Sequence, residues 1–282
     1  MCYSILLEAK ELSFRYPDET PALNDVNVYI KQAEAVAILG ANGAGKTTLL
    51  KHFVGLLNPT RGEVFVAGKP IRKPYLKKIY QQVGFVFQNP DEQLFAPTVA
   101  EDVGFGPFNL GLNQTQVQNR VGEALKQVGL EDMGDKLIHH LSWGQKKRAA
   151  IAGVLAMRPK ALILDEPTAG LDPKGADELL KLLHRLKKSQ GLTLLISTHE
   201  IDRVPLYADR VYVMRRGEIA SYGDVRFVFS QSPLLKECHL RPPIISQLFA
   251  EVFKELHIQD KHLPMTLHEA KELLQQLISN LK

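Results

Sequence analysis

The chain has 282 residues, of which 45% are hydrophobic and 23% charged, and this ordinary composition excludes a wholly disordered protein. Its net charge of +4 is too small to indicate a nucleic-acid partner. Two cysteines, Cys2 and Cys238, are too few for a disulfide framework or a zinc cluster. No apolar run reaches the ~18 residues that a membrane-spanning helix needs, so we expect any membrane role to act through a partner.

The N-terminal third predicts strands around one glycine-rich loop. Residues 5–30 alternate apolar and polar positions on both sides of a turn-rich segment, which predicts two strands. The apolar run at 36–40 predicts a buried strand, and the periodicity after the loop predicts a helix. Residues 62–71 predict a second strand pair, and residues 83–87 predict a short strand.

Helices and strands then alternate along the chain. The pattern over 99–157 is mainly helical, and we interpret about 89–157 as a helical insertion. Buried strands are predicted at 161–165 and 192–197, separated by a helix that Asp172 caps at its start, and a hairpin follows at 210–223. This order predicts an α/β fold with a mostly parallel sheet and functional sites at the carboxyl ends of its strands.

Residues 224–282 lack strand signals and predict a small C-terminal helical region after a main domain at 1–223. Thr266 and Glu269 are expected to form a capping box at the last helix. That helix carries an apolar stripe of Leu267, Ala270, Leu274, Leu277 and Leu281. We expect the stripe to hold two subunits together, and packing onto the chain's own core remains the alternative.

Residues 40–48 match the phosphate-binding pattern G-x-x-x-x-G-K-[ST], between a predicted strand and a predicted helix. Its glycines let backbone N–H groups converge on phosphate oxygens, and the helix N-terminus adds partial positive charge. Lys46 would hold the β- and γ-phosphates, and Thr47 would give its hydroxyl to Mg²⁺. The alternative is a glycine-rich turn with a solvated lysine. The residues expected to bind nucleotide here are Gly40, Ala41, Asn42, Gly43, Ala44, Gly45, Lys46, Thr47 and Thr48.

Two adjacent carboxylates follow the predicted strand 161–165. Hydrolysis of a γ-phosphate needs a metal held in place and a water aimed in line. Asp165 can orient Mg²⁺, and Glu166 can act as the base that polarises the attacking water. A charged pair that merely ends a strand is the alternative.

Residues 141–148, LSWGQKKR, resemble the LSGGQ signature of ABC ATPases and lie upstream of the Asp165–Glu166 pair in the family's order. The resemblance extends through GANGAGKTT and DEPTAGLD and covers roughly residues 5–223. It implies a phosphate-loop NTPase core with an antiparallel β subdomain, an ATPase activity, and ATP and Mg²⁺ as cofactors.

The resemblance also assigns roles within one subunit. Tyr16 would stack on adenine, Gln88 would sense both Mg²⁺ and the γ-phosphate, and His199 would contact the γ-phosphate. Lys46 and Glu166 complete the catalytic set that the resemblance implies. In isolation Tyr16 could be an ordinary strand aromatic, and Gln88 and His199 could be surface polar residues.

Other roles cross a dimer interface. Ser142, Gly144 and Gln145 would close on the γ-phosphate of ATP bound to a second copy of the chain, and Asp172 would communicate between the two subunits. Trp143 stands where the signature usually has glycine. Because Gly144 is retained, we expect the site to remain active.

Within the family, residues 87–95, the signature helix and the C-terminal region resemble ATPase subunits of energy-coupling-factor importers, most of all the cobalt and nickel group. This resemblance implies a homodimeric motor at the cytoplasmic face of the membrane. Its partners would be a transmembrane coupling subunit and a substrate-binding membrane subunit, with no nucleic acid. A vitamin importer of the same class is the near alternative, and a soluble ABC ATPase acting on ribosomes or nucleic acid is a further one.

A docking groove for the membrane partner is expected just after Gln88. In the resembling importers this groove receives basic coupling helices, and Leu94 and Phe95 could supply an apolar anchor. A solvated acidic loop is the alternative. The acidic residues concentrated there are Asp91, Glu92, Glu101 and Asp102.

Overall fold

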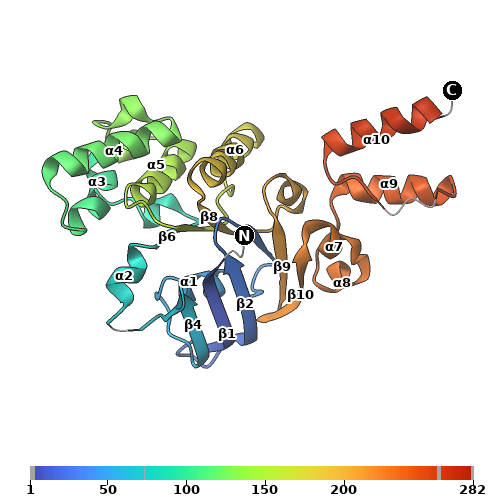
Figure 1. Ribbon diagram of the computed structural model, residues 1–282, viewed down its shortest axis with the longest axis horizontal. Helices are drawn as coiled ribbons and strands as arrows, with labels where there is room; N and C mark the ends of the chain where they lie inside the picture. The colour runs from blue at the N-terminus through green and yellow to red at the C-terminus, as the bar shows by residue number, and fades with distance from the viewer. Residues whose placement is uncertain (1–3, 73, 259–261, 281–282) are drawn as a thin grey trace.

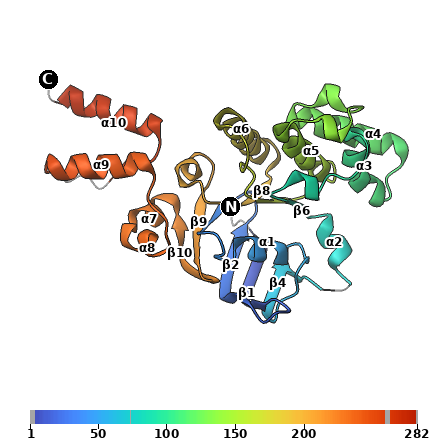
Figure 2. The ribbon, with the colours of Figure 1, turned by 180° about the vertical axis from the view of Figure 1, so that it is seen from behind.

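The computed structural model describes residues 4–72, 74–258 and 262–280. Two β-sheets form the body, a group of helices lies at one end, and a pair of C-terminal helices extends from the other (Figure 1). The view from behind shows the same separation of the two ends (Figure 2). No helix in the described ranges is both long and apolar enough to cross a bilayer. Cys2 and Leu281, both named above, lie outside the described residues.

The first sheet is antiparallel and confirms the expected β subdomain. Its alternating residues place one face against the phosphate-loop helix, so Leu12, Val26 and Val28 are buried in a common core with Leu49 and Phe53. Its strands run in the order β2-β1-β4-β5. They are β1 (Ile5–Arg15), β2 (Pro21–Lys31), β4 (Arg61–Val66) and β5 (Lys69–Pro70).

The second sheet has the order β10-β9-β3-β8-β7-β6, and only β10 runs antiparallel to its neighbour. Every residue of β3, β7 and β8 is buried, as expected for parallel strands covered on both faces. The carboxyl ends of these strands therefore meet at one edge, where the candidate site lies. The strands are β3 (Ala35–Leu39), β6 (Val83–Val86), β7 (Ala161–Asp165), β8 (Thr193–Thr198), β9 (Arg210–Arg215) and β10 (Glu218–Asp224).

Helices α3, α4 and α5 contact one another and form the expected helical insertion. Asp172 caps α6 by accepting a hydrogen bond from the Gly175 N–H, and Gly191 ends that helix with φ 64°. The α-helices up to this point are α1 (Lys46–His52), α2 (Leu76–Tyr80), α3 (Val99–Asn109), α4 (Gln114–Val128), α5 (Trp143–Leu155) and α6 (Pro173–Gln190). Short 3-10 helices lie at η1 (Pro90–Glu92), η2 (Glu131–Met133), η3 (Ile138–His140) and η4 (Ile201–Leu206).

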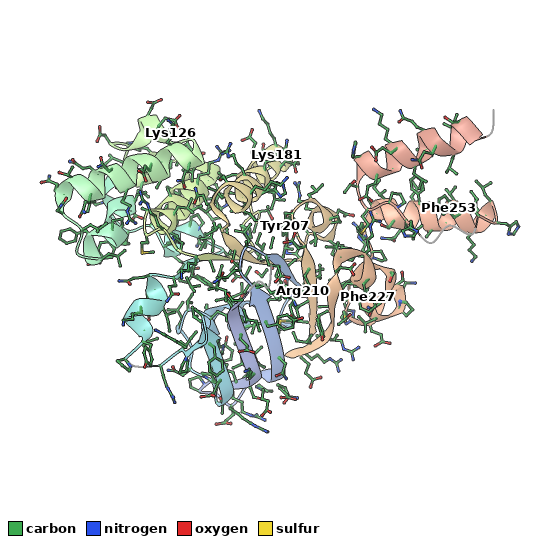
Figure 3. The ribbon with its side chains drawn as sticks, viewed as in Figure 1. Lys126, Lys181, Tyr207, Arg210, Phe227 and Phe253 are labelled. Carbon is green, nitrogen blue, oxygen red and sulfur yellow. The ribbon has the colours of Figure 1, made fainter. Side chains whose placement is uncertain are left out.

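The C-terminal region contains α7 (Val225–Ser230), α8 (Ser232–Glu237), α9 (Ile244–Glu255) and α10 (Leu267–Asn280). The first of these packs on the β9–β10 hairpin. The last two form a separate hairpin with its own small core, in which Phe253 lies between them (Figure 3).

One expected feature of α10 needs a correction, and another is met in part. Thr266 accepts from the Glu269 N–H as predicted, but the Glu269 carboxylate accepts from the Met265 N–H, one residue earlier than a capping box requires. It also pairs with Arg226 of α7, which draws the carboxylate away from the cap. The predicted stripe is divided as well, because Ala270 is buried against α9 whereas Leu267 and Leu274 are exposed.

Candidate active site

The phosphate loop joins β3 to α1 in a conformation that only small residues allow. A Cβ on Gly45, which has φ 102°, would lie 2.8 Å from the Ala22 carbonyl oxygen. The Lys46 ammonium is buried and donates to the carbonyl oxygens of Gly40 at 2.8 Å and Ala41 at 3.2 Å. The loop carbonyls thus hold the Lys46 ammonium at a position where it can bind an anion.

Three elements meet at the Asp165 carboxylate, which ends β7. The Thr47 hydroxyl of α1 donates to one carboxylate oxygen at 2.7 Å, and the Ser197 hydroxyl of β8 donates to the other. Hydroxyl and carboxylate oxygens are the ligands that Mg²⁺ prefers, so this pair fits that ion. In the described part of the chain no group of three or more His, Cys, Asp or Glu side chains could hold a metal.

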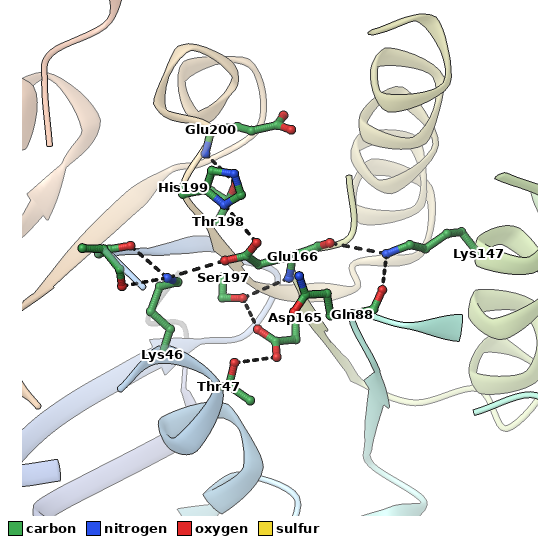
Figure 4. Close-up of polar contacts among 12 residues, drawn as sticks. Lys46, Thr47, Gln88, Lys147, Asp165, Glu166, Ser197, Thr198, His199 and Glu200 are labelled. Carbon is green, nitrogen blue, oxygen red and sulfur yellow. Dashed lines mark hydrogen bonds and ion pairs between the residues drawn. The ribbon is translucent and has the colours of Figure 1, made fainter. Parts of the chain in front are cut away.

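Glu166 lies between the phosphate loop and His199 (Figure 4). One of its carboxylate oxygens is 3.5 Å from the Lys46 Nζ, and the other is 2.9 Å from the His199 Nδ1. Its backbone has φ 42°, a region that non-glycine residues rarely adopt. The Glu166 N–H donates to the Ser197 hydroxyl oxygen at 3.0 Å and to the Ser197 carbonyl oxygen at 3.1 Å, which holds this conformation. Sequence reasoning missed Ser197, whose only signal is a hydroxyl within a buried apolar strand.

The signature residues lie at the start of α5. Ser142 is the N-cap: its hydroxyl accepts from the Gln145 N–H at 3.3 Å, and the Gln145 side chain accepts from the Ser142 N–H at 3.0 Å. With Gly144 and Leu171 they line a cavity of about 270 Å³ that includes no phosphate-loop residue. The structure therefore brings Lys46, Thr47, Asp165, Glu166 and His199 together, and among the described residues Ser142, Gly144 and Gln145 line a separate cavity.

A family described as ABC transporter matches residues 23–169, from the second strand through the phosphate loop and the signature to the segment after Glu166. The chain belongs to the ABC transporter ATPases. It therefore has a nucleotide-hydrolysing cassette, and the resemblance drawn from its motifs is confirmed.

Relatives place this ABC ATPase in the energy-coupling factor group. The energy-coupling factor transporter ATP-binding protein EcfA of Methanocaldococcus jannaschii is 53% identical over 90% of this chain and 91% of its own length. The EcfA of Methanosphaera stadtmanae is 47% identical over 95% of this chain and 98% of its own length. The solved structure of cbiO1 from Clostridium perfringens, part of the ABC transporter complex cbiONQ, is 43% identical with a TM-score of 0.76, covering 90% of this chain and 99% of that one.

Tyr16 of this ABC ATPase reaches the edge of the phosphate loop. Its hydroxyl is 2.9 Å from the Thr48 hydroxyl oxygen, and its ring packs edge-on against Phe14 with centroids 5.0 Å apart. The ring is half-buried just after β1. This placement is compatible with a base stacked on its free face, which stays a prediction.

Lys147 is a residue that sequence reasoning missed. It lies on α5 and is 1% exposed, yet its Nζ donates to the Gln88 carbonyl oxygen at 2.6 Å, just beyond β6. Burial lowers the pKa of Lys147 to about 8, and the nearby Asp165 and Glu166 carboxylates partly offset this. No sequence signal distinguishes this lysine from its neighbour Lys146.

The acidic docking cluster predicted after Gln88 is only partly exposed. Asp102 is buried, and its carboxylate accepts from the backbone N–H groups of Phe95 and Ala96, so its assignment as a docking charge was wrong. Asp91 pairs with Lys146 at 2.7 Å. The neighbouring groove is instead mainly apolar: a cavity of about 600 Å³ is lined by residues that include Leu56, Tyr80, Phe85, Phe95, Phe105 and Met157.

Proposed function

We propose that this chain is the homodimeric ATP-hydrolysing motor of an energy-coupling factor importer for cobalt or nickel ions, attached to the cytoplasmic face of the membrane. The observation that carries the motor role is the Glu166 carboxylate, placed between the Lys46 ammonium and the His199 ring at the phosphate loop. The choice of metal ions rests on the resemblance of LSWGQKKR to the cobalt and nickel group. Vitamin import by the same class of complex is the second candidate.

Hydrolysis follows from how these side chains are held before ATP arrives. Lys46 pairs with Glu166, and the β- and γ-phosphates of ATP would take over the ammonium. The freed carboxylate accepts a proton from the attacking water, whose oxygen bonds to the γ-phosphorus as the bond to the ADP oxygen breaks. His199 is the donor on the other side of that carboxylate. Thr47, Asp165 and the Gln88 side chain would hold Mg²⁺, which supplies positive charge against the phosphate oxygens.

The signature completes the site from a second copy of the chain. Ser142 and the first N–H groups of α5 form an anion site at a helix start, and Ser142 is exposed. Because they lie apart from their own phosphate loop, we assign Ser142, Gly144 and Gln145 to the partner's γ-phosphate, with Asp172 at the interface. An ATP-binding cassette that is 30% identical, with a TM-score of 0.69 over 78% of this chain and 99% of that one, was solved as a dimer with ADP and phosphate.

Replacing Glu166 with glutamine tests the motor. Glu166→Gln should bind ATP and accumulate as an ATP-bound dimer, because an amide cannot accept the water proton while the Thr47–Asp165 pair survives. Turnover should fall by about 10²- to 10⁴-fold, measured as phosphate release, and size-exclusion chromatography with and without ATP reports the dimer. Glu131→Gln, at an exposed position, is the matched control. Wild-type turnover in Glu166→Gln would remove this carboxylate from the mechanism.

Uptake by the whole complex tests the substrate. The native complex, purified from membranes and placed in vesicles, should accumulate Co²⁺ or Ni²⁺ when ATP is present on the side of the ATPase. The Glu166→Gln complex should accumulate neither ion. Uptake of a vitamin with no uptake of either ion would select the second candidate.

A further inference from the structure

The side chain of Lys147 extends from the signature helix into the catalytic centre of its own subunit (Figure 4). Its Nζ lies 2.6 Å from the Gln88 carbonyl oxygen and 3.4 Å from the Glu166 carbonyl oxygen. Gln88 follows β6 and Glu166 follows β7, so one ammonium holds two adjacent chain segments. These segments carry the side chains that we assign to the γ-phosphate and to the attacking water.

Burying the Lys147 ammonium costs free energy of desolvation. Burial of a charge costs several kcal/mol unless hydrogen bonds and counter-charges compensate, and an apolar side chain of similar volume is often equally stable. Here the charge is met by two carbonyl oxygens, with the Asp165 and Glu166 carboxylates nearby. The gain specific to a lysine is that two backbone segments are held to one helix.

The first turn of α5 makes a second connection to the segment after Glu166. The Trp143 Nε1 donates to the Ala169 carbonyl oxygen at 3.1 Å, and the Trp143 ring centroid lies 6.0 Å from the Lys147 Nζ. Gly170 allows this approach, because a Cβ there would lie 2.7 Å from the Trp143 Nε1. The first two turns of α5 are thus joined to the Glu166 carbonyl and to the segment that follows it.

We propose that Lys147 is a positioning residue, which transmits the placement of the signature to Gln88 and Glu166 of its own subunit. This inference rests on the proposed function in one respect, that Ser142 and Gln145 read the ATP held by the partner. When the partner's site binds ATP, α5 shifts. This shift moves the Lys147 ammonium and, with it, the backbone that orients the Glu166 carboxylate. The position of each subunit's catalytic base therefore depends on whether the other site holds ATP.

Substitutions in the full-length chain separate positioning from packing. Lys147→Met keeps the volume and removes the donor, so kcat should fall by about tenfold or more while KM for ATP changes by less than about twofold. Lys147→Gln restores an N–H donor and should recover most of the lost kcat. The melting temperature of Lys147→Met should match or exceed the wild-type value, because an apolar isostere removes a buried charge. Lys126→Met, on an exposed residue of α4, is the control and should keep wild-type kcat and KM.

The trapped dimer distinguishes this inference from the proposed function. Glu166→Gln carrying Lys147→Met should still form the ATP-bound dimer seen with Glu166→Gln alone. Failure of Glu166→Gln itself to trap a dimer would count against the proposed function. The inference is overturned if only the double variant fails to trap, if Lys147→Met keeps kcat within about twofold of wild type, or if the control Lys126→Met loses as much kcat. Should Lys147→Met not fold, Lys147→Gln decides. A kcat reduced by between about twofold and tenfold with unchanged KM and melting temperature supports the role, whereas wild-type kcat, or a melting temperature lowered together with ATP affinity, refutes it.

Discussion

Glu166 combines a strained backbone with the position that we assign to the catalytic base. Its left-handed conformation costs a non-glycine residue on the order of 1–3 kcal/mol, and the surrounding contacts must hold it there. Ser197 does so, because its hydroxyl accepts from the Glu166 N–H while donating to the Asp165 carboxylate. One hydroxyl of β8 therefore orients both the residue assigned to the metal and the residue assigned to the water.

His52 makes the stability of the phosphate-loop helix depend on pH. It is 1% exposed, its Nδ1 is 2.8 Å from the Thr48 carbonyl oxygen, and burial lowers its pKa below the ordinary 6.5, against opposing hydrogen bonds to Thr48 and Asn58. Just below pH 6.5, His52 becomes protonated in the unfolded chain, whereas burial keeps it neutral in the folded chain. The stability that neutral His52 contributes is therefore complete above pH 6.5 and is lost as the pH falls toward its folded pKa.

Replacing His52 with glutamine should reduce this pH dependence. Urea unfolding at pH 7.5 and 5.5 measures the free energy of unfolding, and the wild-type protein should lose up to ~1.4 kcal/mol per pH unit more than His52→Gln over that window. His257→Gln, on an exposed residue, should keep the wild-type pH dependence. Equal losses in wild type and His52→Gln would contradict the assignment.

Among the elements, α3 and the segment after β6 form the groove that we assign to the membrane coupling subunit. Phe95 and Phe105 meet edge-on with centroids 4.7 Å apart and are both exposed, at 65% and 50%. Exposed aromatic rings beside a cavity are typical of a protein interface. Because Asp91 is already paired with Lys146, reversing its charge would also disturb α5 and would be a less clean test.

A carboxylate in this groove should weaken assembly. Phe105→Asp should reduce co-purification of the transmembrane subunit by about tenfold or more, because an unpaired charge opposes burial of an apolar anchor. ATP binding by the isolated subunit should be unchanged. Phe108→Asp, also on α3 but outside the cavity lining, is the control. Unchanged assembly of Phe105→Asp would place the docking site elsewhere.

For the molecule as a whole, separation of the signature from its own phosphate loop predicts reciprocal sites. A mixed dimer of Lys46→Ala and Ser142→Ala subunits has one intact composite site and one doubly damaged site. Its activity should therefore exceed that of either homodimer but stay below half of wild type, because the Glu166 of the intact site lies in the subunit whose signature faces the damaged site and so lacks the proposed Lys147 coupling. Differently tagged subunits purified in tandem provide the measurement. No recovery in verified mixed dimers would argue for sites within single subunits.

The C-terminal hairpin offers a second contact between subunits. Arg241 and the Ile244 N–H bind Asp202 of η4, and Arg226 binds Glu269, so polar contacts tie the hairpin to the body. Its outward side chains remain apolar and exposed, namely Ile244, Leu248, Leu256, Leu267, Leu274 and Ile278. We infer that they meet a second copy, because an apolar surface of this kind is typical of an interface.

Deleting residues 243–282 should weaken association of nucleotide-free subunits and leave ATP binding intact. Leu248→Ser with Leu256→Ser tests the same surface while keeping both helices, and should raise the dimer dissociation constant by about tenfold or more. Sedimentation of nucleotide-free protein gives that constant. Gln247→Ser is the control on α9. If both the deletion and the double variant associate like wild type, the hairpin serves only its own subunit.

The sequence by itself determined the features whose causes are local. The phosphate loop, Asp165 and Glu166 after a buried strand, and the caps of α6 at Asp172 and Gly191 all depend on neighbours within a few residues. The alternation of apolar runs also predicted both sheets and the helical insertion. Because these signals are short in range, they could be read before any tertiary contact was known.

Only the tertiary structure decided which distant side chains share an environment. Ser197 lies 32 residues from Asp165 in sequence, and Lys147 lies 59 residues from Gln88, yet each pair is joined by a hydrogen bond. The sequence predicted Asp102 as a docking charge, but the fold buries its carboxylate, which accepts a hydrogen bond from the Phe95 N–H. Burial and pairing depend on how β6, β7 and β8 align with α1 and α5, and that alignment follows from packing of the whole core rather than from any local pattern.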